Sequence, residues 1–287
     1  MKVIYSYWKT NEHFFVTEEF ALISNKLAQN HGYETILFTD KYGKEELKNV
    51  GFNKVVLLDD YLLERFPLTG WSLAKICAMA SMEEPFMHMD FDLFLMKDLD
   101  KKFFENPVFC LHKERWLTEP QGEKDKNGRF IKNSIINPYS FEFLDKVNIL
   151  LRETEDNFSI KRYHKLNSYN CAIVGGQNFH LFKKASEYVI KYAIKYKEIL
   201  ENFSKIHSMN VDWFPAVFLE QILFMNLIKL NSGLEDIPVY LKSETTEDLN
   251  IEAQKEKIIH IWGSKLKFKN NIEKFIDTLR KDLPFSI

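Results

Sequence analysis

The sequence predicts an α/β fold, with a central sheet of mostly parallel strands flanked by helices. Short runs rich in β-branched and aromatic residues alternate with helical patterns of apolar residues through the N-terminal part of the chain. Acidic residues follow several of these runs, at the strand ends where parallel sheets bind ligands. The length of 287 residues fits one large domain of this class.

Composition narrows the class of protein further. A hydrophobic content of 45% that includes 25 phenylalanines supports a large aromatic core. The formal net charge of −2 provides no bulk attraction for nucleic acid, so we expect no nucleic-acid partner. No run approaches the roughly 20 apolar residues that cross a bilayer, so we expect no transmembrane segment, although peripheral membrane contact is compatible with the sequence.

We expect a cytoplasmic location. The N-terminus becomes polar too early for a signal peptide. Three cysteines, Cys77, Cys110 and Cys171, lack metal-type spacing, which is typical of buried thiols in a reducing compartment.

The first part of the chain alternates strand and helix. The β-rich runs predict strands at residues 3–7, 34–39, 54–58 and 85–95. Apolar residues at helical spacing predict helices at residues 16–31, 44–49 and 71–80. Helical crossovers between short strands imply a parallel, doubly wound sheet.

The second part is richer in helix. A polar stretch at residues 116–137 predicts a long surface loop. We expect helices at residues 141–151, 182–196 and 213–230 and a last one that ends near 283, with strands at 169–175 and 257–261. The helix at 213–230 is apolar nearly all round except at Glu220 and Gln221, which predicts a buried helix with two polar side chains.

Asp90 and Asp92 form the most informative motif, because they lie within an apolar run that reads as a buried strand. Burial of an unpaired carboxylate costs several kcal/mol, and two neighbouring carboxylates repel each other. Mg²⁺ or Mn²⁺ would satisfy both, since these cations prefer carboxylate oxygens and are often shared with substrate phosphates. The alternative is a strand end that exposes both acids to water.

The spacing alone is not diagnostic. Asp98 and Asp100 repeat it and are followed by Lys101 and Lys102, in a charged stretch where solvated side chains are the better interpretation. The apolar surroundings therefore distinguish the first pair.

A family resemblance follows from three features together. The N-terminal α/β half, the Asp-x-Asp after an apolar strand and the segment His260-Ile261-Trp262-Gly263-Ser264-Lys265 resemble metal-dependent glycosyltransferases of the GT-A fold, and the last segment is similar to the tail motif of the glycogenin and lipopolysaccharide-galactosyltransferase type. The resemblance implies a single GT-A-like, Rossmann-like domain. Residues 1–110 would then be the nucleotide-sugar-binding half, and residues 111–287 the acceptor-side half with helical elements and a metal- and phosphate-binding tail.

The resemblance also implies the metal ligands. Asp92 would bind Mn²⁺ or Mg²⁺ directly, Asp90 would face the metal through water or the donor ribose, and His260 would complete the site from the C-terminal strand. A hydrogen-bonded core histidine is the alternative interpretation of His260, which lies between two isoleucines.

Further residues are implied to bind the nucleotide-sugar donor. Lys75, Lys265 and Gly263 would contact the diphosphate. Alternatively, the Lys75 stem would only cover apolar surface on its helix. Tyr5, Ser6 and Tyr7 could sandwich the base at the end of the first strand, although both tyrosines could equally be half-buried strand residues.

The acceptor side has weaker signals. Asn170, Gly175 and Gly176 resemble the strand and small-residue turn that let an acceptor sugar approach, although such glycines serve any tight turn. Glu220 and Asp212 are the candidate catalytic bases, because desolvation would raise the pKa of a carboxyl in an apolar helix. The alternative for Glu220 is a buried acid paired with Lys, Arg or Gln.

The resemblance therefore implies a hexosyltransferase-type enzyme that transfers a sugar from a nucleotide sugar, with UDP as the expected nucleotide, to a glycan or glycolipid of a bacterial surface polysaccharide. The sequence does not decide between retention and inversion. One alternative, a sugar-phosphate nucleotidyltransferase, needs a Gly- and Lys/Arg-rich phosphate loop that Trp8-Lys9-Thr10-Asn11 does not supply. The other, a non-enzymatic Ca²⁺-binding lectin-like domain, needs more oxygen ligands in one loop than are visible.

Overall fold

The structure is a computed structural model that describes residues 1–8, 18–67, 69–114, 141–154, 167–209, 213–240 and 258–260. Its strands are β1 (Lys2–Tyr7), β2 (Glu34–Thr39), β3 (Lys54–Leu57), β4 (Phe86–Met89), β5 (Leu93–Leu95), β6 (Phe109–Glu114), β7 (Ser168–Gly176) and β8 (Ile258–His260). Its longer helices are α1 (Glu18–Asn30), α4 (Gly70–Ala80), α5 (Phe141–Glu153), α6 (Phe179–Lys195) and α7 (Lys197–Ile206). Shorter ones are α2 (Lys41–Glu46), α3 (Asp60–Glu64) and η1 (Lys101–Glu105), and α8 (Phe214–Val217), η3 (Phe218–Phe224) and α9 (Met225–Ser232) follow one another directly. The loop predicted at 116–137 and the last predicted helix lie outside the described residues.

The α/β prediction is confirmed, and the described strands form a mixed sheet. Six strands hydrogen-bond in the order β3-β2-β1-β4-β7-β6, and β5 pairs separately with β8. The neighbours from β3 to β4 are parallel, as the helical crossovers require. By contrast, β7 runs antiparallel to both β4 and β6.

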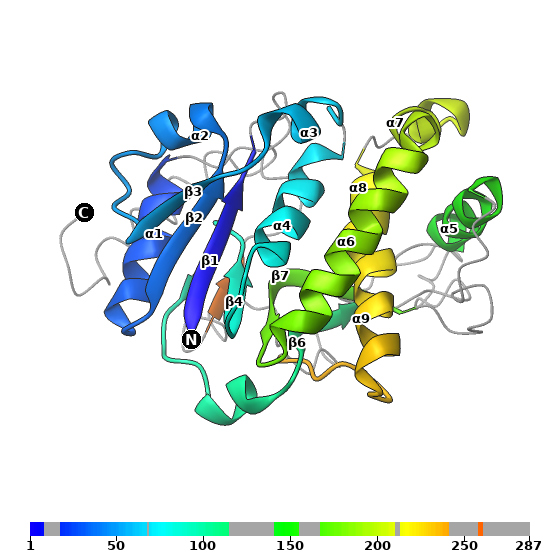
Figure 1. The fold of residues 1–287 in the computed structure, drawn as a ribbon. Coiled ribbons are helices and arrows are strands. Elements are labelled where there is room, and N and C mark those ends of the chain that lie inside the picture. The colour runs from blue at the N-terminus through cyan, green and yellow to red at the C-terminus, as the bar shows by residue number, and fades with distance from the viewer. Residues whose placement is uncertain are drawn as a thin grey trace, which may run out of the picture.

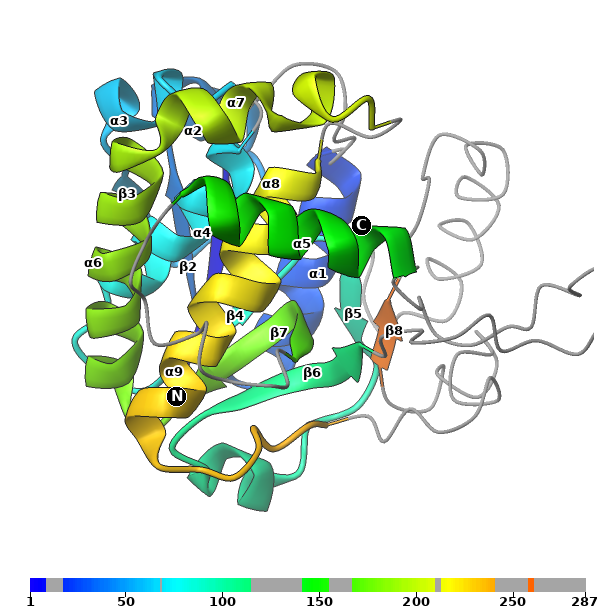
Figure 2. The same cartoon turned by 90° about the vertical axis from the view of Figure 1, so that its right-hand side faces the viewer.

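Helices cover both faces of this sheet (Figures 1 and 2). Because side chains alternate along a strand, Val3 and Tyr5 of β1 join the core beneath α1, whereas Ile4 joins the core shared with α4, α6 and α9. The helix predicted at 213–230 is confirmed as the buried run of α8, η3 and α9. The same alternation decides which face each site residue can reach.

Gly175 and Gly176 end β7 at the far end of β4 from Asp90. Gly176 pairs with Phe86 and Gly175 with Met87, roughly 10 Å or more from Asp90 at about 3.3 Å per residue. A Cβ on Gly175 would lie only 2.2 Å from the carbonyl oxygen of Phe86. Both glycines are buried and serve close strand packing, so the prediction that they let an acceptor sugar approach the donor is corrected.

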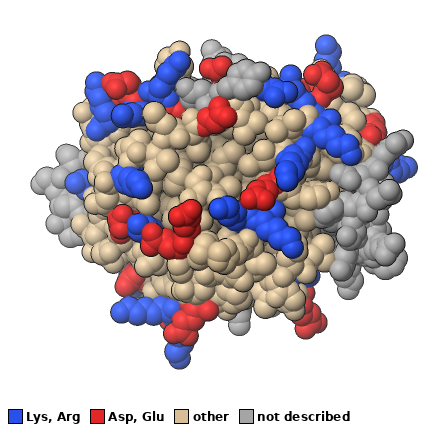
Figure 3. Space-filling view, in the orientation of Figure 1, with Lys and Arg blue, Asp and Glu red and all other residues tan. Residues whose placement is uncertain are grey.

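The visible surface carries charges of both signs. On the face shown in Figure 3, basic and acidic side chains are interspersed over the helices and strands. No helix in the described part of the chain has the length and apolar character to traverse a bilayer.

Gly175→Ala should destabilise the protein through this strand contact. The added Cβ would overlap the backbone of Phe86 and Met87, which cannot move away as a flexible side chain could. We therefore expect a loss of about 3 kcal/mol or more in the free energy of unfolding, measured in urea. Gly32→Ala is the control, since its site is open and only its φ of 81° is unfavourable, at about 1 kcal/mol. Equal losses in the two variants would contradict the packing argument.

Candidate functional site

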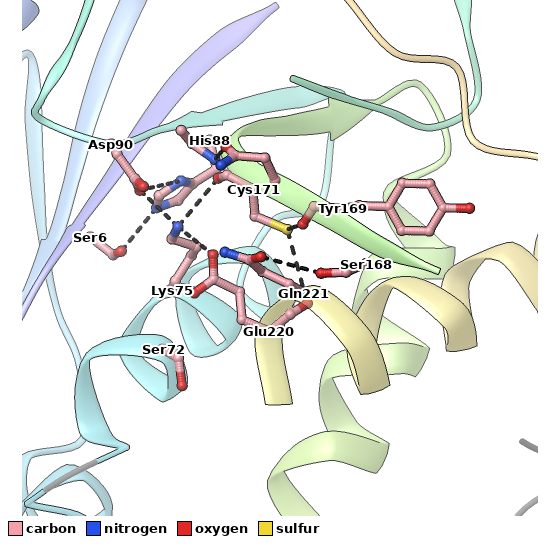
Figure 4. Close-up of polar contacts among 12 residues, drawn as sticks. Ser6, Ser72, Lys75, His88, Asp90, Ser168, Tyr169, Cys171, Glu220 and Gln221 are labelled. Carbon is pink, nitrogen blue, oxygen red and sulfur yellow. Dashed lines mark hydrogen bonds and ion pairs between the residues drawn. The ribbon is translucent and has the colours of Figure 1, made fainter. Parts of the chain in front are cut away.

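The candidate site lies at the carboxyl end of β4, on the face that carries α4. His88 and Asp90 project to this face because they alternate with Met87 and Met89, which belong to the opposite core. Ser6 at the end of β1 reaches the same side and contacts His88 (Figure 4). Parallel β1 and β4 thus bring their polar residues together at one edge of the sheet.

The ammonium group of Lys75 is the centre of this cluster. It lies 2.7 Å from Asp90 Oδ1, 2.6 Å from Glu220 Oε1 and 3.2 Å from the carbonyl oxygen of Cys171 (Figure 4). An ammonium group has three protons, and these three acceptors account for all of them. The side chain is 4% exposed, so Lys75 connects α4, β4, β7 and η3 from within the protein.

The charge of Lys75 stabilises two carboxylates that repel each other. Burial lowers the pKa of Lys75, but the carboxylates of Asp90 and Glu220 outweigh it and keep the group charged. Burial raises the pKa of Glu220, and Lys75 opposes that rise. Of the described buried atoms, Oε2 of Glu220 has no hydrogen-bond partner, so two carboxylates share one ammonium group.

Glu220 lies in a π-helical segment. Residues Phe218–Phe224 form the π-helix η3 between α8 and α9, a rare geometry that is frequent at functional sites. Gln221 follows Glu220 and accepts a 3.4 Å hydrogen bond from the hydroxyl of Ser168 on β7. The segment therefore presents two consecutive polar side chains to neighbouring elements of the site.

His88 is a site residue that the sequence analysis did not identify. Its Nε2 lies 2.9 Å from Ser6 Oγ, and its Nδ1 lies 3.8 Å from Asp90 Oδ1. Burial, and then the charge of Lys75, lower the pKa of His88 well below its ordinary value, so the ring is neutral. Its position two residues before Asp90 on a strand was the signal for a shared face.

Ser6, His88 and Asp90 follow the order of a Ser-His-Asp triad, but the surroundings do not support that chemistry. A triad needs a histidine that accepts a proton and a carboxylate that stabilises the resulting imidazolium. Here Lys75 neutralises Asp90 and opposes protonation of His88. The cluster is therefore not arranged to activate Ser6 as a nucleophile.

Asp92 lies directly before β5, the strand that pairs with the C-terminal strand β8. Asp92 is 5% exposed and precedes β5, whose first residue, Leu93, lies opposite His260 in the antiparallel ladder with β8. The backbone of His260 is thus beside the Asp-x-Asp segment despite more than 160 residues of intervening chain. The structure describes the backbone of His260 but not its side chain.

The residues at this edge fit a hard divalent cation by donor chemistry. Asp90 and Asp92 supply carboxylate oxygens, and Asp90 is 33% exposed at the sheet edge. Among the described side chains, no group of three or more His, Cys, Asp or Glu residues is arranged around one point, so a third ligand of these types would have to lie outside them. His260 is the predicted third ligand.

Sequence comparison places the whole chain in one family. A family model described as a family of unknown function (DUF6734) matches residues 1–286. The chain belongs to the DUF6734 family. No curated protein sequence matches it.

In this DUF6734 protein, the two tyrosines predicted to sandwich a base belong to the core. Tyr5 is fully buried, its ring stacks on Phe91 at a centroid distance of 5.0 Å, and its hydroxyl contacts Ser24. Tyr7 is nearly buried and donates a hydrogen bond to Glu46. The Tyr5 ring offers no face to a nucleobase, so its role is corrected to support of the Asp-x-Asp segment.

Two other predicted roles also change. Lys75 has no free proton for a diphosphate, and Glu220 is a buried acid paired with lysine, which is the alternative considered for it above. At 1% exposure, Glu220 does not reach an acceptor. Asn170, the third predicted acceptor residue, is half-buried. Its side chain accepts a hydrogen bond from the backbone N–H of Ala172, and the carbonyl of Ala172 accepts one from the backbone N–H of Asp90. Asn170 therefore lies at the Asp90 end of β7.

Asp212, Gly263 and Lys265 lie outside the described residues. Their predicted roles, a catalytic base and two contacts to the diphosphate, therefore remain predictions.

His88 should make stability sensitive to mild acid. Its folded pKa is depressed, so below about pH 6.5 the unfolded chain binds a proton that the folded protein excludes. The free energy of unfolding should fall with decreasing pH, by at most about 1.4 kcal/mol per pH unit from this residue. Urea titrations in EDTA between pH 7.5 and 5, compared with His88→Gln, measure this, and identical slopes would contradict it.

Proposed function

We propose that this protein is a divalent-metal-dependent glycosyltransferase that transfers a hexose from a nucleotide sugar to a glycan or glycolipid acceptor. UDP is the proposed nucleotide, and the acceptor would belong to a bacterial surface polysaccharide made at the cytoplasmic side. The observation that carries the proposal is the pairing of β5 with β8, which brings the backbone of His260 beside Leu93, directly after Asp92 and three residues after Asp90.

The topology supports a nucleotide at this edge. From β1 the sheet extends through β2 to β3 in one direction, and β4 adds on the other side of β1. The strand order therefore reverses between β1 and β4, and open α/β sheets bind ligands outside the carboxyl ends of strands at such a point. Ser6 and Asp90 both lie there.

The proposed division of labour follows from the side chains. Asp90, Asp92 and His260 would hold Mn²⁺ or Mg²⁺, and Gly263 and Lys265 would approach the diphosphate. A bound cation supplies Lewis-acid stabilisation of the charge that develops on the departing diphosphate. The acceptor hydroxyl forms a bond to the anomeric carbon as the bond to phosphate breaks, and its proton passes to Asp212 or to the leaving phosphate.

Thermal shift measurements with UDP, GDP and CMP, each with and without Mn²⁺, test this proposal. We expect one nucleotide, UDP, to raise the Tm only when Mn²⁺ is present, because a ligand that binds the folded state alone stabilises it. Equal shifts without metal, or no shift in any arm, would contradict a metal-dependent glycosyltransferase.

Asp92→Asn should remove the metal-dependent shift and lower hydrolysis of UDP-sugars by about a hundredfold or more, since a neutral amide is a poor ligand for a hard cation. Asp98→Asn is the matched control, because Asp98 belongs to the second Asp-x-Asp and is exposed. A wild-type response in Asp92→Asn, or equal losses in both variants, would exclude Asp92 as the ligand.

A further inference from the structure

We infer that Lys75 and Glu220 are positioning residues, which hold the Asp90 carboxylate in the orientation that binds metal and nucleotide. The inference rests on the proposed function and assigns these two residues a role that differs from direct contact with donor or acceptor. Its basis is that one buried ammonium group, carried by α4, contacts Asp90 directly after β4, Cys171 of β7 and Glu220 of η3 at once.

Lys75 restricts Asp90 by geometry. Oδ1 of Asp90 lies 2.7 Å from the ammonium nitrogen, while the side chain as a whole remains 33% exposed at the edge of the sheet. The carboxylate is thus held by one oxygen toward the interior. When a ligand binds a carboxylate that is already fixed, binding does not have to offset the entropy cost of ordering that side chain.

Glu220 stabilises the charged form of Lys75 in the interior of the protein. Without it, Lys75 would be a buried cation whose second partner is only a backbone carbonyl, the 3.2 Å contact to Cys171. The 2.6 Å pair with Glu220 compensates the ammonium charge, and the π-helical turn of η3 carries that carboxylate. Because Glu220 is 1% exposed, it acts through Lys75 and not on a bound substrate.

Strand β7 is part of the same unit. The carbonyl of Cys171 accepts from Lys75, and the carbonyl of Ala172, the next residue, accepts from the backbone N–H of Asp90 at 2.9 Å. Two consecutive carbonyls of β7 therefore fix Asp90: that of Cys171 holds its side chain through Lys75, and that of Ala172 holds its backbone. A substitution of Lys75 should therefore alter the orientation of the Asp90 side chain.

A charge-balanced double variant, Lys75→Met with Glu220→Gln, tests the inference. It removes one charge of each sign, so the net charge of the cluster is unchanged and neither Lys75 nor Glu220 is left behind as an unpaired buried charge. Asp90, which is 33% exposed, loses the contact under test. We expect a folded protein whose affinity for Mn²⁺ alone, and for UDP with Mn²⁺, each falls about tenfold in calorimetric titrations. The control is Lys2→Met with Glu84→Gln, which removes a 2.9 Å ion pair at the start of β1, and should bind as the wild type does.

The outcomes separate the hypotheses. Unchanged affinities in the folded double variant would overturn the positioning role while the proposed function stands. Weaker UDP binding with unchanged Mn²⁺ binding would also overturn it, because that result indicates direct contact between Lys75 and phosphate. A wild-type protein that binds no nucleotide with Mn²⁺ would overturn the proposed function and this inference with it.

A second variant covers loss of folding. If the double variant does not fold, Lys75→Arg keeps the charge but replaces a compact ammonium with a planar group that cannot direct its protons to the same three acceptors. The same fall in Mn²⁺ affinity is expected, and wild-type affinity in a folded Lys75→Arg protein would overturn the inference.

Discussion

The buried ammonium group of Lys75 is the constraint on which the polar face of this protein depends. A charge in the interior is stable only if its partners are fixed, and here the partners come from a strand end, a neighbouring strand and a π-helix. The buried charge therefore restricts the positions of Asp90, Glu220 and the Cys171 carbonyl. The carboxyl end of β4 is held by electrostatics on this face of the sheet.

The other face holds the same segment by aromatic packing. Phe91, which separates the two acids, stacks on Tyr5 and meets Tyr7 edge-on. Ser24 of α1 donates a hydrogen bond to the carbonyl of Leu93, directly after Asp92. The Asp-x-Asp segment is thus fixed from both sides before any ligand arrives, which is the preorganisation that a binding site needs.

Local pattern was enough to predict the alternation of strands and helices, the buried helix around Glu220 and the carboxylates at a strand end. Alternation along β4 also contained the signal for His88, since residues two apart share a face. The pairing of Lys75 with Glu220, 145 positions along the chain, depends on tertiary packing and has no local signature. The direction of β7 is likewise not encoded locally, and it is what moves Gly175 and Gly176 away from Asp90 while Asn170 stays near.

The central claim is that one cation binds between Asp90 and Asp92, which lie between β4 and β5, and the strand of His260, beneath a nucleotide diphosphate. A crystal grown with Mn²⁺ and UDP, with anomalous scattering recorded at the manganese edge, tests it most directly. The account predicts one strong anomalous peak within bonding distance of the Asp92 carboxylate and the His260 imidazole, with the diphosphate against it. A peak elsewhere, or ordered UDP without a metal at Asp92, would contradict the account.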